Sequence, residues 1–586
     1  MKTVQHRLRL GTEWLVGRKW YALVSLGLLS CSLLIQPDVL IHLSPDSSLH
    51  PDTLLSITFL RLFLGIMSAM VVFWPDLANA SRRKLLIGLL ALLALGTRAV
   101  RLNAPYLDQH AHRQTDVATI ARNFYEVDPN IFWPQVNWHA DGPNYIESTF
   151  PAIPWLTSLG YRFTGEQPWV GRGIVALFAV LGVVAMFGLV NLYWGQPAGF
   201  VAGLFLALSP LSVYFGRALI DDVPSLSLAI AGLWGVAAWA RTDQRRALVL
   251  GLIAIALAML IKVVALYIYF PVVAILWDRW RWQALRRPVA WAIVILPMLP
   301  NLAWYGWAHQ IGQQYLTFGL GGGATGARTD LLAYSKWGSV DFVLSQMFLK
   351  QMERRLWREI LMLPGLIALI FGLFAFFRWK LPGRTVIAAF LFGTVLFTAV
   401  SGRAQWVHNY YQLPLAAALA PFFGLGLAML WQGGNPVPRT PEYSRGSLRQ
   451  RLGPWAALGL VLWFALFSAR KLPTYYNDWQ GWILDETKLV QSLTAPTDRI
   501  VTVTFDSAPT LLYHLDRPGW VVDYLNPLAL AQVPRHVANG ARVVILHDMH
   551  RPESNVLAGQ PWIEGLELVD QTTRYTIYFV PEGVSP

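Results

Sequence analysis

Residues 171–194 read GRGIVALFAVLGVVAMFGLVNLYW, a run in which Arg172 is the only charged residue. At about 1.5 Å of rise per residue, a helix of this length crosses a hydrocarbon core about 30 Å thick. The whole chain has the same character: of 586 residues, 55% are hydrophobic and 14% are charged. Soluble domains carry about 25% charged residues. The sequence therefore predicts a polytopic α-helical membrane protein.

Apolar runs near the length of about 20 residues that a membrane span needs recur along the chain. We predict thirteen transmembrane helices: Tyr21–Gln36, Leu54–Trp74, Leu85–Val100, Gly171–Trp194, Ala198–Tyr214, Ser225–Ala240, Ala247–Ile261, Val264–Trp277, Val289–Trp304, Ile360–Phe377, Thr385–Ser401, Leu413–Trp431 and Trp455–Ala469.

Basic residues in the short loops predict the orientation, because cytoplasmic loops hold an excess of Lys and Arg. Arg7, Arg9, Arg18 and Lys19 precede the first span, whereas residues 37–53 contain neither Lys nor Arg. We therefore expect a multi-pass protein of the cell (inner) membrane with a cytoplasmic N-terminus. The net charge of +13 then reflects basic residues in the cytoplasmic loops. We therefore do not expect nucleic acid as a partner.

Alternation from this N-terminus places a tail after Lys471 outside the membrane. Runs rich in β-forming residues, separated by turn residues, predict a small α/β extracytoplasmic domain there. These runs are Arg499–Thr504, Trp520–Asp523, Arg542–His547 and Arg574–Val580. We expect two domains, a transmembrane catalytic domain over residues 1–470 and this domain over residues 471–586. The single cysteine, Cys31, excludes an intramolecular disulfide and a cysteine-based metal site.

The first long outer loop concentrates ionisable residues, with Asp108, His110, His112, Arg113 and Asp116 close together. Apolar residues at helical spacing from residue 115 predict an amphipathic helix on the membrane surface, capped by residue 115 or 116. Asp116 would then point into an adjoining pocket, and a plain helix cap is the alternative. His110 and His112 are weak candidates for metal ligands, which leaves a divalent metal open. Arg113 and Arg122 fit either phosphate binding or contact with lipid headgroups.

Three later outer segments add charged and aromatic residues near the ends of spans. Asp221 and Asp222 form an acidic pair, and such a pair close to hydrocarbon is costly unless it serves a function. The alternative for this pair is a salt bridge to Arg217 together with a helix cap. Lys262 lies between two spans and either binds an anion or snorkels to the interface. An aromatic belt explains the tyrosines, but not the neighbouring Arg and His. The candidates are Arg217, Asp221 and Asp222; Lys262; and Arg403, His408, Tyr410 and Tyr411.

Carboxylates, cations and aromatic rings at the outer mouth of a helix bundle suit sugar transfer from a lipid-linked phosphate. A carboxylate acts as general base on an acceptor hydroxyl, while Arg and Lys stabilise the departing phosphate. Grooves between spans hold the polyprenyl chain. A nucleotide-sugar donor fits poorly because no inner segment resembles a site for one.

These residues resemble the GT-C superfamily of integral-membrane glycosyltransferases, in particular the family 39-like group related to protein O-mannosyltransferases and the aminoarabinose transferase. The resemblance rests on four segments and covers the chain to about Ala469: residues 108–124, the stretch LSPLSVYFGRALIDD at 208–222, Lys262, and YYQLP at 410–414. It implies a hexosyl- or pentosyltransferase that makes envelope glycans from a polyprenyl-phosphate-sugar donor and a lipid, glycan or protein acceptor. It also implies a catalytic aspartate, either Asp116 or Asp108; we favour Asp116 because it lies at the start of the predicted helix. The family's common Asp-Glu pair is absent here, since Gln109 follows Asp108.

Three alternatives stay open. A ligase that moves a whole polysaccharide from a lipid carrier would use the same groups on a larger donor. A transporter would show related halves and charges near the midplane of the membrane, whereas the charges here gather at the ends of spans. An inactive scaffold would keep the surface glycans unchanged when Asp116 or Lys262 is substituted.

Overall fold

The computed structural model describes residues 61, 63–65, 79–140, 142–317, 337–436, 448–477, 479–505 and 509–581. The chain forms two compact units made of interleaved segments. The first, which we call the helical unit, contains Met1–Leu102, Val175–Pro300 and Trp337–Asn477; the second, the mixed unit, contains Asn103–Ile174, Asn301–Lys336 and Asp478–Pro586. The domain boundary proposed at residue 470 stays a prediction.

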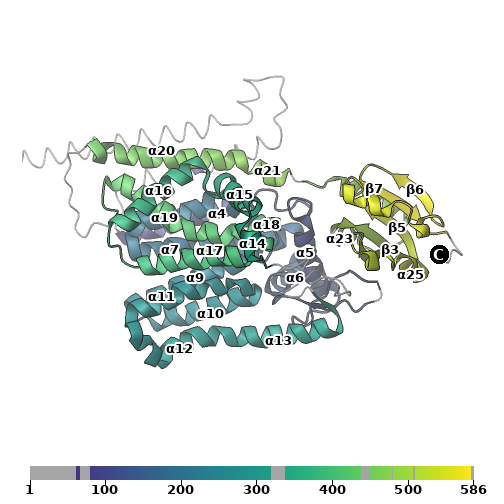
Figure 1. Ribbon diagram of the computed structural model, residues 1–586, viewed down its shortest axis with the longest axis horizontal. Coiled ribbons are helices and arrows are strands. Elements are labelled where there is room, and N and C mark those ends of the chain that lie inside the picture. Colours follow the sequence, from purple (N-terminus) through teal and green to yellow (C-terminus); the bar gives the residue numbers. More distant parts are fainter. Residues whose placement is uncertain are drawn as a thin grey trace, which may run out of the picture. The chain divides into compact units, whose positions relative to one another are not determined.

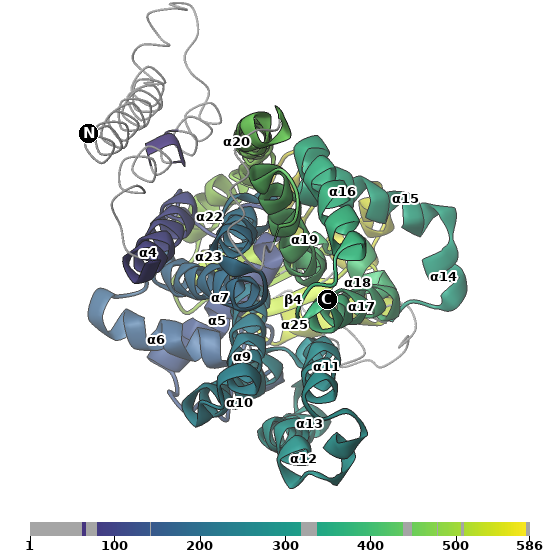
Figure 2. The ribbon, with the colours of Figure 1, turned by 90° about the vertical axis from the view of Figure 1, so that its left-hand side faces the viewer.

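The helical unit is a bundle of long apolar helices (Figures 1 and 2). The first residues of α7 and most of α13 are assigned to the mixed unit. The α-helices are α4 (Asn79–Arg98), α7 (Pro168–Leu208), α8 (Pro210–Phe215), α9 (Asp222–Thr242), α10 (Arg245–Ile261), α11 (Tyr269–Trp280), α12 (Pro288–Ile295), α13 (Leu299–Gln314), α14 (Val340–Leu344), α15 (Gln346–Arg355), α16 (Met362–Arg378), α17 (Arg384–Val400), α18 (Gly402–Val407), α19 (Leu413–Gln432), α20 (Leu448–Lys471) and α21 (Pro473–Tyr476). The 3-10 helices are η1 (Val263–Ile268), η2 (Arg281–Arg286), η3 (Leu296–Met298) and η5 (Asn409–Gln412), and η4 (Leu356–Leu361) is a π-helix.

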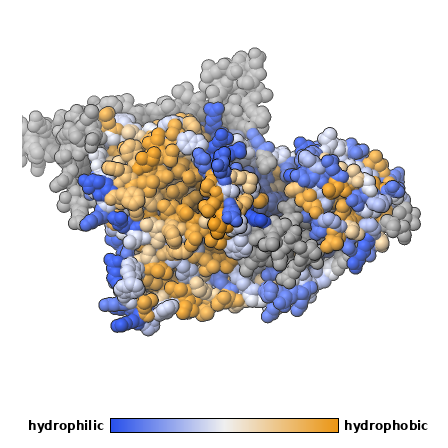
Figure 3. Space-filling model, viewed as in Figure 1, coloured by the Kyte–Doolittle hydropathy of each residue, from blue (hydrophilic) through white to orange (hydrophobic). Residues whose placement is uncertain are grey.

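Several of these helices are suited to a membrane, and apolar residues cover much of the visible face of the helical unit (Figure 3). Among the described residues, seven helical stretches are long and apolar enough to cross a bilayer: Pro168–Leu208, Asp222–Thr242, Val263–Arg286, Pro288–Gln314, Gln346–Arg378, Asn409–Gln432 and Leu452–Tyr476. The predicted class of fold is confirmed, but the predicted number of thirteen spans is not. The first predicted span, and most of the second, lie outside the described residues.

The boundaries of α7 show how local sequence divides the bundle. Gly195 has φ 85° and ψ 174°, which is not helical, and Pro197 follows it. Proline lacks the N–H that a continuous helix would use, so α7 consists of two pieces that match the predicted spans Gly171–Trp194 and Ala198–Tyr214. The second piece ends at Leu208, earlier than predicted, and Pro210 begins α8.

Helices α9 and α10 pack closely through glycines. A Cβ atom at Gly235 would lie 2.7 Å from the carbonyl oxygen of Ala247 and 2.8 Å from Cα of Gly251. Small residues allow helix backbones in a membrane to approach one another. The two helices are consecutive in the chain, so the first residue of α9 and the last of α10 lie at the same end of the pair.

In the mixed unit a five-stranded sheet has the order β4-β3-β5-β7-β6, with β3 parallel to both β4 and β5 and the last two pairings antiparallel (Figure 1). Four of its strands confirm the predicted runs, whereas the sequence reading missed β6. That strand is an exposed edge with Glu567 and Asp570, so it lacks the apolar alternation that marks a half-buried strand. The strands are β3 (Arg499–Thr504), β4 (Gly519–Asp523), β5 (Ala541–His547), β6 (Glu567–Gln571) and β7 (Tyr575–Phe579).

Alternate residues of these strands build two cores, because successive side chains point to opposite faces of a sheet. On one face, Val501 and Val544 pack with Val537 of α25 (Val533–Ala538). On the other, Ile500 and Ile545 pack with residues of α22 (Trp482–Leu493) and α23 (Thr510–Leu515). Further short elements are α24 (Pro527–Leu530), η7 (Pro552–Leu557) and η8 (Pro561–Ile563).

The segment Asn103–Ile174 also belongs to the mixed unit and contains α5 (Ala111–Glu126), α6 (Ala152–Thr164) and β1 (Ile146–Glu147), which pairs with β2 (Leu316–Thr317). Two predictions about α5 are wrong. The helix begins at Ala111 after His110 in a left-handed conformation, so Asp116 lies in the second turn and not at the N-cap. The hydroxyl of Thr115 donates to carbonyls within the helix. Most residues of α5 are buried, which differs from a surface helix with one buried face.

Candidate active site

In the helical unit, the packing of α9 against α10 brings Asp222 and Lys262 together. Asp222 is the first residue of α9, and Lys262 follows α10 in an extended conformation. Lys262 Nζ lies 2.5 Å from Asp222 Oδ1, and the two side chains are 13% and 9% exposed. Of the acidic pair, Asp222 is therefore the partner of Lys262. Asp221 is buried beside it.

Two tyrosines of η5 cover the Lys262 ammonium. Its Nζ lies 4.4 Å from the ring centroid of Tyr411 and 5.3 Å from that of Tyr410, within the range of cation–π attraction. The ring of His408 stacks on Tyr410, with 5.0 Å between centroids and 16° between planes. Tyr410 and Tyr411 are 4% and 7% exposed, so they are core residues of the unit rather than a belt at the membrane surface.

A second buried cation, Arg217, is held by aromatic rings. Its guanidinium lies 4.6 Å from the ring centroid of Tyr476 and 5.3 Å from that of Tyr214, and Nη1 donates to the Arg101 carbonyl at 3.1 Å. Arg98, which the sequence reading did not select, is also fully buried and donates to the Ser212 hydroxyl at 3.0 Å. Arg403 lies half-buried on α18.

The sequence reading also missed Glu359, because nothing in the sequence signals the π-helix η4 that carries it. One of its carboxylate oxygens, Oε2, accepts hydrogen bonds from Asn409 Nδ2 at 2.9 Å and from the Tyr475 hydroxyl at 3.1 Å. Asn409 directly precedes Tyr410 in η5, so Glu359 fixes the segment that covers Lys262.

In the mixed unit, Asp108 forms a buried ion pair with Arg172. Its Oδ1 accepts hydrogen bonds from Gln114 Nε2 at 2.6 Å and from Arg172 Nη2 at 3.2 Å. The side chains of Arg172 and Asp108 are 0% and 2% exposed. The Arg172 guanidinium also lies 4.8 Å from the ring centroid of Tyr106. Arg172, the only charge in its apolar run, is thus a partner of Asp108.

Asp116 is buried in the second turn of α5, with Oδ2 3.8 Å from Nη1 of Arg113. The Arg113 side chain is 24% exposed, so this ion pair reaches solvent more readily than the one at Asp108. The two candidate aspartates therefore differ in environment. Asp108 is enclosed with the buried guanidinium of Arg172, whereas Asp116 lies beside the partly exposed guanidinium of Arg113.

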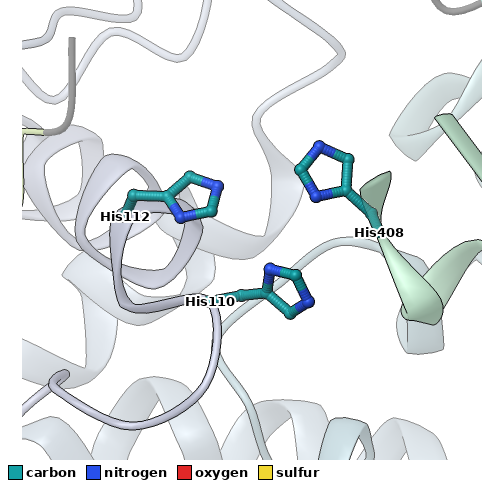
Figure 4. A group of neighbouring side chains, drawn as sticks. All are labelled: His110, His112 and His408. Atoms are coloured by element: carbon teal, nitrogen blue, oxygen red, sulfur yellow. The ribbon is translucent and has the colours of Figure 1, made fainter. Parts of the chain in front are cut away.

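His110 and His112 lie close together at the start of α5, with 5.8 Å between ring centroids. Figure 4 labels both imidazoles, together with His408 of the helical unit. Burial, assisted by His110 and Arg113, lowers the pKa of His112 to about 3. A neutral imidazole is the form that binds a metal, but two imidazoles are fewer than the three or four protein ligands of a zinc site. A metal here stays a prediction.

The comparisons with known proteins identify the fold. Residues 143–304 match the family model described as dolichyl-phosphate-mannose-protein mannosyltransferase. ArnT from Cupriavidus metallidurans in the apo state is 15% identical, with a TM-score of 0.58 over 86% of this chain and 98% of that one. The same protein bound to undecaprenyl phosphate is 14% identical, with a TM-score of 0.56 over 86% and 99%.

A third similar structure is the oligosaccharyltransferase of Archaeoglobus fulgidus in complex with zinc and sulfate. It is 13% identical, with a TM-score of 0.54 over 85% of this chain and 74% of that one. No curated protein sequence matches the chain. The chain is a polytopic membrane protein with the GT-C fold, as the resemblance implied.

Proposed function

We propose that the protein is a GT-C glycosyltransferase that moves a sugar from a polyprenyl-phosphate-linked donor to an acceptor hydroxyl at the extracytoplasmic face of the membrane. The observation that carries the proposal is Lys262, a cation held by Asp222 and two tyrosines at the end of an apolar helix pair. The shared fold supports it, because ArnT with this fold has been crystallised with undecaprenyl phosphate.

Lys262 supplies the positive charge that the leaving phosphate needs. When the bond between the anomeric carbon and the phosphate oxygen breaks, negative charge grows on the phosphate, and a cation already in place stabilises it without reorganising. Asp222 holds the ammonium in position, while Tyr410 and Tyr411 limit its access to water. Arg217, Arg403 and His408 are the further candidates for the donor phosphate.

Asp116 is the proposed general base. Asp108 is less suited to accept a proton, because its Oδ1 already accepts hydrogen bonds from both Gln114 and Arg172 inside the protein. Asp116 lies beside Arg113, whose side chain is partly exposed, in contrast to the enclosed Arg172 beside Asp108. The base takes the acceptor's hydroxyl proton as that oxygen attacks the anomeric carbon, and the lipid phosphate leaves.

The proposed orientation follows the basic loops, with the N-terminus in the cytoplasm and the C-terminal α/β region outside the cell membrane. A donor whose polyprenyl chain stays in the bilayer reaches such a site laterally, and the acceptor arrives from the aqueous side. Lipid, glycan and protein acceptors all present the hydroxyl that this chemistry requires.

The test is a transfer assay with the purified full-length protein, synthetic polyprenyl-phosphate sugars and envelope extract, with products identified by mass spectrometry. We expect a single-sugar mass increment and its loss in Asp116→Asn. Asp485→Asn, which neutralises an exposed carboxylate on α22, serves as the matched control. A whole-polysaccharide increment would support the ligase instead. Undiminished transfer in Asp116→Asn would reject the base, and flux of the lipid-linked sugar without any transfer would reject the enzyme.

A further inference from the structure

Within the mixed unit, a partly buried ion pair between Arg122 of α5 and Glu166, which neither sequence alternative for Arg122 predicted, contacts the C-terminal α/β region through Tyr513. Arg122 Nε and Nη2 donate to the two carboxylate oxygens of Glu166 at 2.8 Å and 2.9 Å. The Tyr513 hydroxyl of α23 donates to Glu166 Oε1 at 2.6 Å. The Arg122 guanidinium also lies 4.2 Å from the centroid of the Tyr513 ring.

Further contacts join the same two segments. Arg122 Nη1 donates to the Tyr513 carbonyl at 3.2 Å and to Asp516 Oδ1 at 3.1 Å. The hydroxyl of Thr115, the residue directly before Asp116, lies 3.4 Å from the hydroxyl of Thr510 in α23. Helix α5 is therefore held against α23 at Thr115, directly before Asp116, and again at Arg122.

The chain that leads into α5 is held by the same region. The Leu107 carbonyl accepts a hydrogen bond from the backbone N–H of Gln480 at 2.8 Å. The Leu107 side chain is fully buried in the core that Ile483 and Leu511 help to form. The C-terminal α/β region thus supports α5 before its first turn and along its length.

We propose that the C-terminal α/β region, residues 479–581, acts as a brace for α5, and that Arg122, Glu166 and Tyr513 are positioning residues for Asp116. This inference rests on the proposed function, in which Asp116 is the base. Bidentate arginine–carboxylate pairs fix geometry as well as adding energy. A general base must stay within hydrogen-bond reach of the proton that it removes, and a displacement of about 1 Å can reduce the rate about 10²-fold.

The decisive variant is Tyr513→Phe, which deletes the hydroxyl bonded to Glu166 and keeps the ring under Arg122. Tyr575→Phe is the matched control, because it removes a hydrogen bond of 3.1 Å to Asp570 in the same region without touching α5. We expect Tyr513→Phe to lower kcat about tenfold, while the KM values for donor and acceptor stay within about twofold of those of the parent protein. Arg122→Lys, which keeps the charge and loses the bidentate geometry, should behave similarly.

Hydrogen exchange of the peptide covering residues 111–126 provides a readout independent of activity. We expect faster exchange in Tyr513→Phe and unchanged exchange in Tyr575→Phe, with both variants folded. Equal kcat and equal exchange in the two variants would overturn the brace. A raised acceptor KM with unchanged kcat would also overturn it and make the region an acceptor-docking module.

The two proposals can fail separately. If Asp116→Asn keeps full turnover, the proposed base is wrong, and hydrogen exchange of α5 alone then decides whether the brace exists. If Asp116→Asn loses turnover while Tyr513→Phe behaves like Tyr575→Phe, the brace is wrong and the proposed base stands.

Discussion

Replacing Lys262 by methionine removes a charge from the centre of the proposed donor site while keeping an unbranched side chain. The lysine forms a 2.5 Å ion pair with Asp222, and both side chains are largely buried. Removing one partner of a buried pair costs about 3–5 kcal/mol, because the other charge is left uncompensated. Since these side chains are 13% and 9% exposed, we expect the lower end, about 3 kcal/mol.

The same change should reduce turnover by a separate route. A phosphate charge about 4 Å from the ammonium interacts with it by about 4 kcal/mol at an effective dielectric constant of about 20. Because each 1.36 kcal/mol changes a rate about tenfold, loss of that interaction in the transition state lowers kcat about 10³-fold.

A second substitution separates the two effects. In Lys262→Met/Asp222→Asn no buried charge is left unpaired, so thermal stability should largely return while turnover stays about 10³-fold down. The assays are thermal unfolding in detergent and single-sugar transfer, with Lys488→Met on the exposed face of α22 as the control. If the double variant recovers turnover to within about threefold of the parent, Lys262 serves only the ion pair and the proposed phosphate role is refuted.

Further expectations concern the base, the sheet and the helix pair. Asp116→Asn should lower kcat about 10² to 10⁴-fold with little effect on melting, whereas Asp108→Asn should mainly lower the melting temperature, because it leaves a buried guanidinium uncompensated; the reverse pattern would exchange their roles. Burial raises the pKa of Glu486; burial alone would lower the pKa of His547, but the Glu486 carboxylate raises it above 6.5. Glu486 and His547 both bind protons more tightly in the folded state than in the unfolded state. Their contribution to the free energy of unfolding is therefore complete below the unfolded pKa values of 4.5 and 6.5, and it declines as the pH rises through each folded pKa. Hydrogen exchange of β5, corrected for intrinsic rates, should therefore indicate lower stability at pH 8 than at pH 6, and equal stability would contradict this sign. Gly235→Val should destabilise the α9–α10 pair by about 2 kcal/mol or more and lower donor use, because its Cβ would meet backbone atoms; an unchanged melting temperature would show that the helices can separate freely.

The sequence pattern predicted those helices and strands that are built from runs of apolar residues. The apolar runs predicted most helices of the described bundle, and the β-rich runs predicted β3, β4, β5 and β7 almost to the residue. It failed at β6, whose edge is exposed, and at the start of α5, where His110 takes a left-handed conformation that no capping pattern indicates. The strands that the sequence predicted are mostly buried runs of apolar residues, whereas β6 is exposed along most of its length.

The sequence by itself determined that the chain enters a membrane, that its C-terminal part carries a sheet, and which loops gather the acids and cations. Only the tertiary structure decided their partners. Asp222 pairs with Lys262 across 40 positions of sequence, and Asp108 with Arg172 across 64. Hydropathy and periodicity act over one element, whereas an ion pair depends on which helix ends meet. Which helix ends meet is decided by close packing, such as the contact at Gly235, and by the hydrogen bonds between α5 and α23. A pattern along the sequence does not contain these contacts.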